Sequence, residues 1–201
     1  MAISNAHQAW LLFLAAAVAQ NLVLTTGLGS ALIVRLSRQR EHRAVFALCL
    51  LFFSVLTALC FHFLSPLLGD GRAARFLCPL VIVALSAVWY LITVGVLRKA
   101  LPRLYDNTLR TMLPLAAINT VVAGVTLIAP HQFGESLAMD LALAVGASVG
   151  FFLVSLLVAE GVDRMQHTEM PKAFAGLPAL FLYLGILALA LCGFSSDISF
   201  I

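Results

Sequence analysis

The sequence predicts an all-α membrane protein with six transmembrane helices, arranged as two inverted three-helix repeats in which the first helix of each repeat is interrupted. Three observations predict this fold: an apolar composition, long stretches without charge, and an asparagine–glycine pattern that occurs once in each half. Of the 201 residues, 62% are hydrophobic and 10% are charged, and the mean hydropathy is +1.05. Soluble domains carry about 25% charged residues, so this composition excludes an ordinary soluble domain.

The stretches between the charged residues set the number of crossings. A helix needs about 20 apolar residues to cross a bilayer, and six stretches without Asp, Glu, Lys or Arg reach that length. They are 1–34, 44–69, 76–97, 111–134, 141–159 and 173–196. We therefore expect residues 1–201 to form a single transmembrane domain.

The first stretch also contains Ala17-Val18-Ala19, which resembles a signal-peptidase site. No Lys or Arg precedes the apolar run, and the run continues to Val34. We therefore expect the first crossing to be retained.

The basic residues predict the orientation, because cytoplasmic loops of membrane proteins are enriched in Lys and Arg. The loops after the first, third and fifth crossings hold ten of the twelve basic residues, and the opposite side holds Arg72 and Arg75. We expect both termini to lie outside. The net charge of +3 is therefore a topology signal, and no basic patch is interleaved with aromatic residues as nucleic-acid binding would need.

The six crossings divide into two halves, about 1–100 and about 101–201, and three crossings per half require the halves to insert in opposite orientations. The first crossing of each half has an asparagine deep in its apolar run, Asn21 or Asn119. Glycines follow within eight residues: Gly27 and Gly29 after the first asparagine, and Gly124 after the second.

This repeated pattern favours a helix break at mid-depth in both halves. Glycine adopts backbone conformations that other residues avoid, and an amide side chain supplies hydrogen bonds to the freed backbone groups, which have no water to bind in a bilayer. The alternative is a polar contact between intact helices, which also uses Asn and Gly. A second packing signal is the small-residue stretch 146–150, whose partner is either another helix of this chain or a neighbouring protein.

No residue pattern predicts a catalytic or metal site. Two cysteines, Cys49 and Cys60, share a helix face but lie about 16 Å apart at 1.5 Å per residue, and we interpret all four cysteines, which include Cys78 and Cys192, as small apolar side chains. His62 has no second ligand at a useful spacing, so we expect a packed or interfacial residue. We expect Asp140 and Glu160 to be solvated ends of the fifth crossing.

The segment that joins the two halves resembles a known family. It reads "LRKALPRLYDNTLRTMLPLAAINTVVAG" and is similar to membrane subunits of the Rnf and Na⁺-translocating NADH:quinone oxidoreductase (Nqr) complexes, with the RnfA/NqrE type as the most similar. The last loop and crossing, "MPKAFAGLPALFLYLGILALALCGF", and the first crossing, through Gln20, Asn21 and Gly29, extend the resemblance over nearly the whole chain.

The resemblance implies a six-helix inverted-repeat subunit in a bacterial inner membrane. Its partners would be the lipid bilayer, a homologous subunit of opposite topology, and the other Rnf/Nqr-type subunits, which together couple electron transfer to Na⁺ or H⁺ movement. In the family, each break contributes one cysteine to a [2Fe–2S] cluster. Here these positions are Ala31 and Thr120, neither of which supplies the thiolate that such a cluster uses. We therefore expect no cofactor to be bound by this chain.

The family resemblance favours a non-catalytic subunit of an ion-translocating electron-transport complex over an enzyme that acts alone. Two alternatives stay open: a stand-alone inverted-repeat transporter, and a structural subunit that has lost its redox site. Transporters often hold an ionisable residue within the membrane, and we assign none of the ionisable groups to that role.

Overall fold

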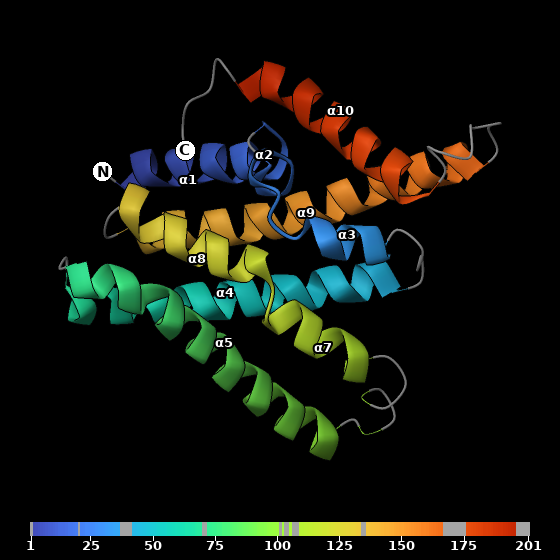
Figure 1. Cartoon of the computed structure of the whole chain (residues 1–201). Coiled ribbons are helices and arrows are strands. Elements are labelled where there is room, and N and C mark those ends of the chain that lie inside the picture. Colours follow the sequence, from blue (N-terminus) through green and yellow to red (C-terminus); the bar gives the residue numbers. More distant parts are fainter. Residues whose placement is uncertain are drawn as a thin grey trace.

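A computed structural model describes residues 2–19, 21–36, 42–69, 72–100, 102, 105, 109–133, 136–166 and 176–195. All regular secondary structure in these ranges is helical (Figure 1). The elements are α1 (Ala2–Leu14), the π-helix η1 (Ala15–Ala19), α2 (Leu22–Thr26), α3 (Ser30–Leu36), α4 (Arg43–Leu68), α5 (Arg72–Ala100), α7 (Arg110–Ala117), α8 (Thr120–Phe133), α9 (Leu137–Gln166) and α10 (Leu177–Ser195).

The described residues include four helical segments long and apolar enough to cross a membrane: Arg43–Leu68, Phe76–Ala100, Arg110–Ile128 and Leu137–Met165. Two shorter apolar helices, His7–Val18 and Leu177–Leu191, fall in the first and last charge-free stretches of the sequence. The prediction of an all-α chain with long apolar helices is therefore confirmed.

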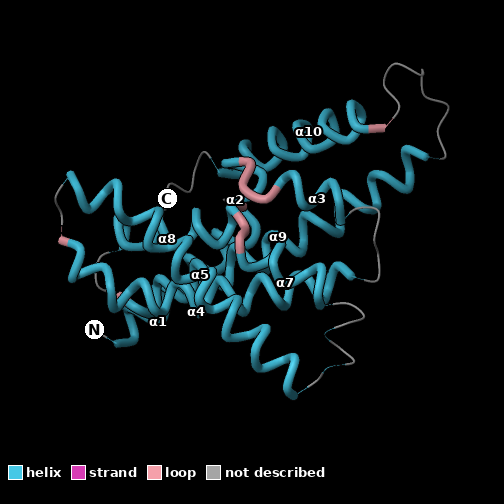
Figure 2. The backbone as a smooth tube through the Cα atoms, turned by 60° about the horizontal axis from the view of Figure 1, so that its bottom comes forward, coloured by secondary structure: helices cyan, strands magenta, loops and turns pink. Residues whose placement is uncertain are grey.

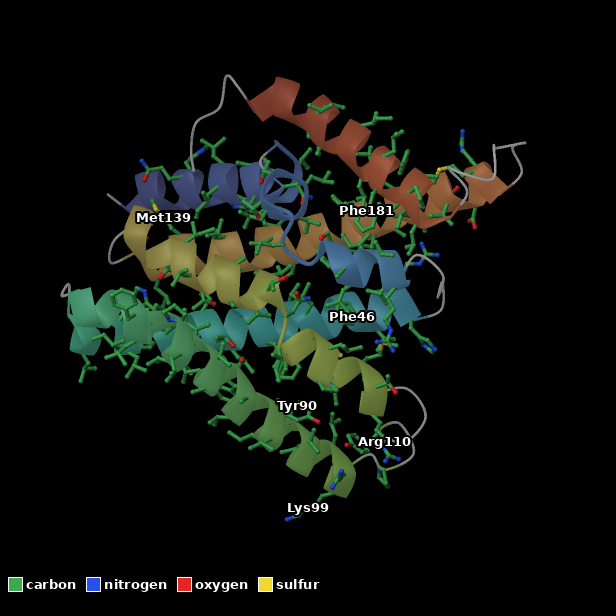
Figure 3. The ribbon with its side chains drawn as sticks, in the orientation of Figure 1. Phe46, Tyr90, Lys99, Arg110, Met139 and Phe181 are labelled. Carbon is green, nitrogen blue, oxygen red and sulfur yellow. The ribbon has the colours of Figure 1, made fainter. Side chains whose placement is uncertain are left out.

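The long helix α9 is the centre of the bundle (Figure 1). It contacts α1, η1, α2, α3, α4, α8 and α10. Phe46 of α4 and Phe151 of α9 lie in ring contact with centroids 5.6 Å apart, and both side chains are buried. The contact between α4 and α9 therefore forms the middle of the core, and Figure 3 shows Phe46 within it.

The outer helices present large apolar side chains to their surroundings. On α5, which diverges from the bundle in Figure 1, Phe76 and Leu91 are 84% and 67% exposed, and Leu189 of α10 is 75% exposed. A soluble monomer rarely tolerates apolar surface of this extent, whereas a lipid environment accommodates it.

The small residues of α9 face α1 and η1 of the same chain, which answers the question left open by the sequence. A Cβ at Gly146 would lie 2.8 Å from the Phe13 carbonyl oxygen and 2.9 Å from the Ala16 Cβ. A Cβ at Gly150 would lie 3.0 Å from the Ala17 carbonyl oxygen. The absence of side chains at these two positions therefore lets α9 approach the backbone of the first helical segments.

We expect Gly146→Ala to destabilise the protein by about 1–3 kcal/mol, the usual cost of overpacking, because the new methyl group meets backbone that cannot rotate away. Gly95→Ala on α5 is the matched control, since a Cβ there meets nothing within 4 Å, and alanine favours a helix by up to about 1 kcal/mol over glycine. Thermal unfolding in detergent measures both. Equal unfolding temperatures for the two variants would contradict the close approach of α1 and α9.

Candidate functional site: two helix breaks in contact

The first break separates η1 from α2 and is bridged by the side chain of Asn21. The Asn21 Oδ1 accepts the Val23 N–H at 3.0 Å and caps α2, while its Nδ2 donates to the Ala17 carbonyl at 3.1 Å. Asn21 is 2% exposed. Its amide therefore satisfies the end of one helix and the start of the next, where water has no access.

A second interruption follows six residues later, because α2 ends at Gly27 in the left-handed conformation, with φ 74°. The Thr25 hydroxyl donates to the Asn21 carbonyl at 3.0 Å, and the Thr26 hydroxyl donates to the Leu22 carbonyl. These threonines bind the carbonyl groups that the end of a short helix leaves free. The first apolar stretch of the chain thus changes direction twice before α3 begins.

The other break lies between α7 and α8, at Ile118 and Asn119. The Ile118 N–H still donates to the Pro114 carbonyl at 3.1 Å, and the helix then stops. The Asn119 Oδ1 accepts the Val121 N–H at 3.1 Å, the same bond that Asn21 makes with Val23. Unlike Asn21, Asn119 has a buried Nδ2 with no hydrogen-bond partner among the described residues.

The two breaks touch each other, although they are about 90 residues apart in the sequence. The Gly29 N–H donates to the Thr120 Oγ1 at 2.9 Å, and the loop segments lie together near the middle of the molecule (Figure 2). A Cβ at Gly29, where φ is 78°, would lie 2.7 Å from the Val121 Cγ2, and a Cβ at Gly124 would collide with the Leu28 side chain. Each glycine therefore makes room for a residue of the opposite break.

Gly124 differs from the sequence interpretation in its role. It lies inside α8, whose helix continues through it to Phe133, so it takes no part in ending a helix. The glycines with left-handed backbone near a break are Gly27 and Gly29. Gly124 instead accommodates the methyl groups of Leu28.

The two positions that correspond to family cysteines are both exposed at the breaks. Ala31 lies in the first turn of α3 and Thr120 is the first residue of α8. The Ala31 side chain has no donor atom, and the Thr120 hydroxyl accepts the Gly29 N–H. The described cysteine side chains, Cys49, Cys60 and Cys78, lie on α4 and α5. Because an iron–sulfur cluster is held by thiolates, the residues at the breaks do not fit such a cluster.

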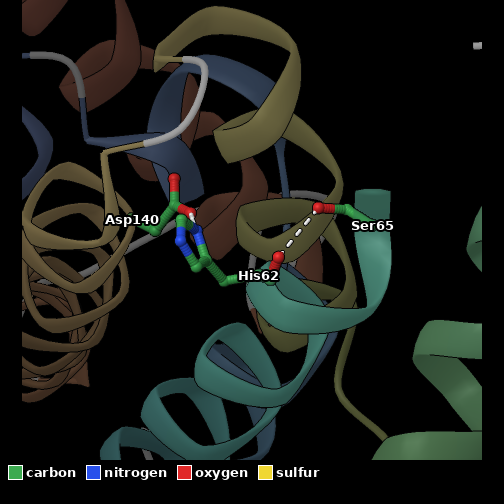
Figure 4. A network of polar contacts seen from close by, with 3 residues as sticks. All are labelled: His62, Ser65 and Asp140. Atoms are coloured by element: carbon green, nitrogen blue, oxygen red, sulfur yellow. Dashed lines mark hydrogen bonds and ion pairs between the residues drawn. The ribbon is translucent and has the colours of Figure 1, made fainter. Parts of the chain in front are cut away.

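A separate polar contact joins α4 to α9 and was not predicted as a site. The His62 Nδ1 lies 2.6 Å from the Asp140 Oδ2, and the Ser65 hydroxyl donates to the His62 carbonyl at 3.0 Å (Figure 4). The Asp140 side chain is 3% exposed, so the expectation of a solvated helix end is wrong for this residue. Glu160, at the other end of α9, is exposed as expected.

The sequence did contain a signal for this pair. His62 and Asp140 lie near the ends of the second and fifth charge-free stretches that the predicted topology places on the outer side. Two ionisable groups at one depth on helices of one bundle are candidates for pairing. What the sequence lacks is the information that α4 and α9 are neighbours.

Long apolar helices, a lipid-compatible surface and polar breaks at the centre define a multi-pass membrane protein. A family model described as "Rnf-Nqr subunit, membrane protein" matches residues 9–197. The chain therefore belongs to the Rnf-Nqr family of membrane subunits.

Several relatives are similar over most of their length, and each is named as the RnfA-type component of an ion-translocating oxidoreductase complex. The one from Rhodobacter capsulatus is 34% identical over 190 residues, covering 92% of this chain and 95% of the relative. The one from Aromatoleum aromaticum is 31% identical over 189 residues, with 94% and 97% covered. The one from Pasteurella multocida is 29% identical, with 92% and 95% covered.

We expect Gly29→Ala to be more destabilising than Gly27→Ala. Both substitutions place a side chain on left-handed backbone, which costs about 1–2 kcal/mol. Only the Gly29 variant also forces a methyl group against Val121 and Phe151, since a Cβ at Gly27 meets nothing within 4 Å. Thermal unfolding of the two variants in the same detergent measures the difference, and equal losses would contradict the contact between the breaks.

We expect Asn21→Ala to be more destabilising than Asn119→Ala. The first substitution removes hydrogen bonds to the Val23 N–H and the Ala17 carbonyl, and each buried group left unpaired costs about 1–3 kcal/mol. The second removes one cap, typically worth about 1 kcal/mol, together with a buried N–H₂ group that has no described partner. Unfolding temperatures of both variants test the order, and a reversed order would show that Asn119 carries more of the stability.

Proposed function

We propose that this chain is an integral membrane subunit of an ion-translocating oxidoreductase complex of Rnf/Nqr type, in which it contributes to coupling electron transfer to Na⁺ or H⁺ movement. The observation that carries the proposal is the family match over residues 9–197, together with relatives named as components of such a complex that this chain covers almost end to end. The chain acts as a non-catalytic part of the complex.

We further propose that residues 1–201 form one transmembrane domain of six crossings, with inverted repeats over about 1–100 and about 101–201. Each half begins with an interrupted helix whose second part is capped by an asparagine, Asn21 or Asn119. The helices also alternate in direction: α3, α5 and α9 end at the same end of the bundle where α4 and α7 begin (Figure 1). Lys99 and Arg110 extend from this end (Figure 3).

That end of the bundle would face the cytoplasm by the positive-inside rule. The chain then lies in a bacterial inner membrane with both termini on the periplasmic side. In support, α1 begins and α10 ends toward the opposite end of the bundle (Figure 1).

The exposed side of the breaks is the proposed site of a partner subunit. Thr25, Thr26 and Thr120 are exposed there, next to Ile118, which is 61% exposed. Irregular backbone at membrane depth is tolerated only where protein or a water-filled cavity covers it. A homologous membrane subunit of opposite topology, which would present a matching pair of breaks, satisfies this requirement.

We propose that this chain binds no [2Fe–2S] cluster of its own, since neither Ala31 nor Thr120 offers a thiolate. Iron and acid-labile sulfide analysis of the purified chain measures this directly. Stoichiometric iron retained by the chain alone would contradict it.

The partner proposal is tested by co-purification of a tagged chain from its native membrane in mild detergent. We expect Rnf/Nqr-type subunits in the eluate, and Ile118→Trp to lower their recovery about tenfold, the effect of about 1.4 kcal/mol of lost binding energy. Leu189→Trp is the matched control, because Leu189 is as exposed but lies on α10, away from the breaks. Recovery of the chain without such subunits, or equal loss in both variants, would count against the proposal.

A further inference from the structure

The contact between His62 and Asp140 lies outside the two breaks and has no part in the proposed function. It joins two of the helical segments long and apolar enough to cross a membrane, Arg43–Leu68 and Leu137–Met165. Ionisable residues within such segments are costly and mark ion or proton pathways more often than structural contacts. We propose that His62 and Asp140 together form a binding site for one exchangeable proton.

The geometry requires a hydrogen between the two groups. A nitrogen and an oxygen 2.6 Å apart repel each other if neither carries a proton, and at this distance they form a short, charge-assisted hydrogen bond. With one proton on the pair, imidazole is neutral, carboxylate is anionic, and the pair carries a net charge of −1. With two protons the pair is neutral, either as imidazolium and carboxylate or as imidazole and carboxylic acid.

Burial favours binding of the second proton. The Asp140 side chain is 3% exposed, and an uncompensated charge in such surroundings costs far more than a neutral pair. The Asp140 Oδ1 is buried and has no hydrogen-bond partner among the described residues. An unsatisfied carboxylate oxygen is a position where a proton, or a proton-donating water, removes that cost.

No cation among the described side chains competes with the proton for this carboxylate. On α4, Arg43 lies 19 residues from His62, and on α9 the next charged residue after Asp140 is Glu160, about 30 Å away along the helix at 1.5 Å per residue. Arg98 and Lys99 occupy the far end of α5, and His7 of α1 is exposed. The described side chains of α8 carry no charge. Arg72, Arg75, His131 and Glu135 have side chains outside the described set.

A metal ion fits the site less well than a proton. Alkali and alkaline-earth ions need several oxygen ligands, and the described residues contain no group of three or more His, Cys, Asp or Glu side chains that could hold a metal ion. The start of α9 adds a further preference, because Asp140 lies in its first turn, where the helix dipole favours a negative group. The neutral state is therefore best described as imidazolium paired with carboxylate.

The site has one accessible and one enclosed side. The His62 side chain is 16% exposed, against 3% for Asp140. A proton from the outside adds to the free Nε2 of the imidazole, and the hydrogen between Nδ1 and Oδ2 links this event to the buried carboxyl group. No electron transfer is required, so the site binds a proton whether or not the chain is part of a redox complex.

The test uses the full-length chain purified in detergent. Its proton uptake between about pH 8 and about pH 5, the range in which histidines titrate, is measured with an indicator dye, and the groups involved are identified by infrared difference spectroscopy. We expect Asp140→Asn to lose about one bound proton per chain and the imidazole and carboxyl difference bands of the pair. His62→Gln should lose the imidazole bands and shift the pH at which the carboxyl band appears.

Glu160→Gln and His7→Gln are the matched controls, since they remove an exposed carboxyl group and an exposed imidazole. Each is expected to keep the bands of the pair. Folding is checked by size-exclusion chromatography, and if Asp140→Asn is not monodisperse, His62→Gln and the spectrum of the wild-type chain with ¹³C-labelled aspartate decide. Proton uptake and difference bands that are the same in wild type, Asp140→Asn and His62→Gln would overturn the proposal, as would a wild-type carboxyl band that does not respond to pH. Neither result depends on co-purification of other subunits.

Discussion

The structure depends on one constraint: a helix that stops inside an apolar bundle exposes backbone N–H and C=O groups that no water can reach. Each break must supply its own hydrogen-bond partners. Asn21 supplies both a donor and an acceptor across the first break, and Thr120 supplies an acceptor for the Gly29 N–H from the other half of the chain. The positions of the neighbouring helices follow from the need to keep these bonds together.

The close packing around the breaks follows from the same requirement. Asn21 reaches its partners only if α9 comes close, and Gly150 allows this, because a Cβ there would lie 2.7 Å from the Asn21 Nδ2. The contact between Gly29 and Thr120 likewise needs Gly29 beside Val121 and Gly124 beneath Leu28. The small residues thus serve hydrogen bonds that lie beside them, in addition to bringing helices together.

Residue patterns predicted the features that depend on local sequence. The apolar runs located α4, α5 and α9, because composition alone decides whether a long helix suits lipid. The asparagines marked where helices end, because Asn is a strong N-cap whose side chain competes for backbone groups. The sequence did not distinguish Gly124, which stays helical, from Gly27 and Gly29, which adopt left-handed backbone. That difference is set by the opposite break and not by the flanking residues.

The pairing of His62 with Asp140 was missed for a related reason. Each residue taken alone has an ordinary role at a helix end, and the contact joins positions 78 residues apart. Only the packing of α4 against α9 removes water from the carboxyl group and leaves the imidazole as its partner. A buried ionisable pair is therefore a property of the helix arrangement, which a single sequence does not specify.

The loss of the family's cysteines and the persistence of the breaks have a common explanation in the Thr120 hydroxyl. The family resemblance places a cysteine at this position, and a thiol is a weak hydrogen-bond acceptor. A hydroxyl oxygen accepts the Gly29 N–H at 2.9 Å, a normal length for such a bond. Threonine therefore joins the two breaks directly, and the arrangement that holds a cluster in the family is held in this chain by a hydrogen bond between its halves.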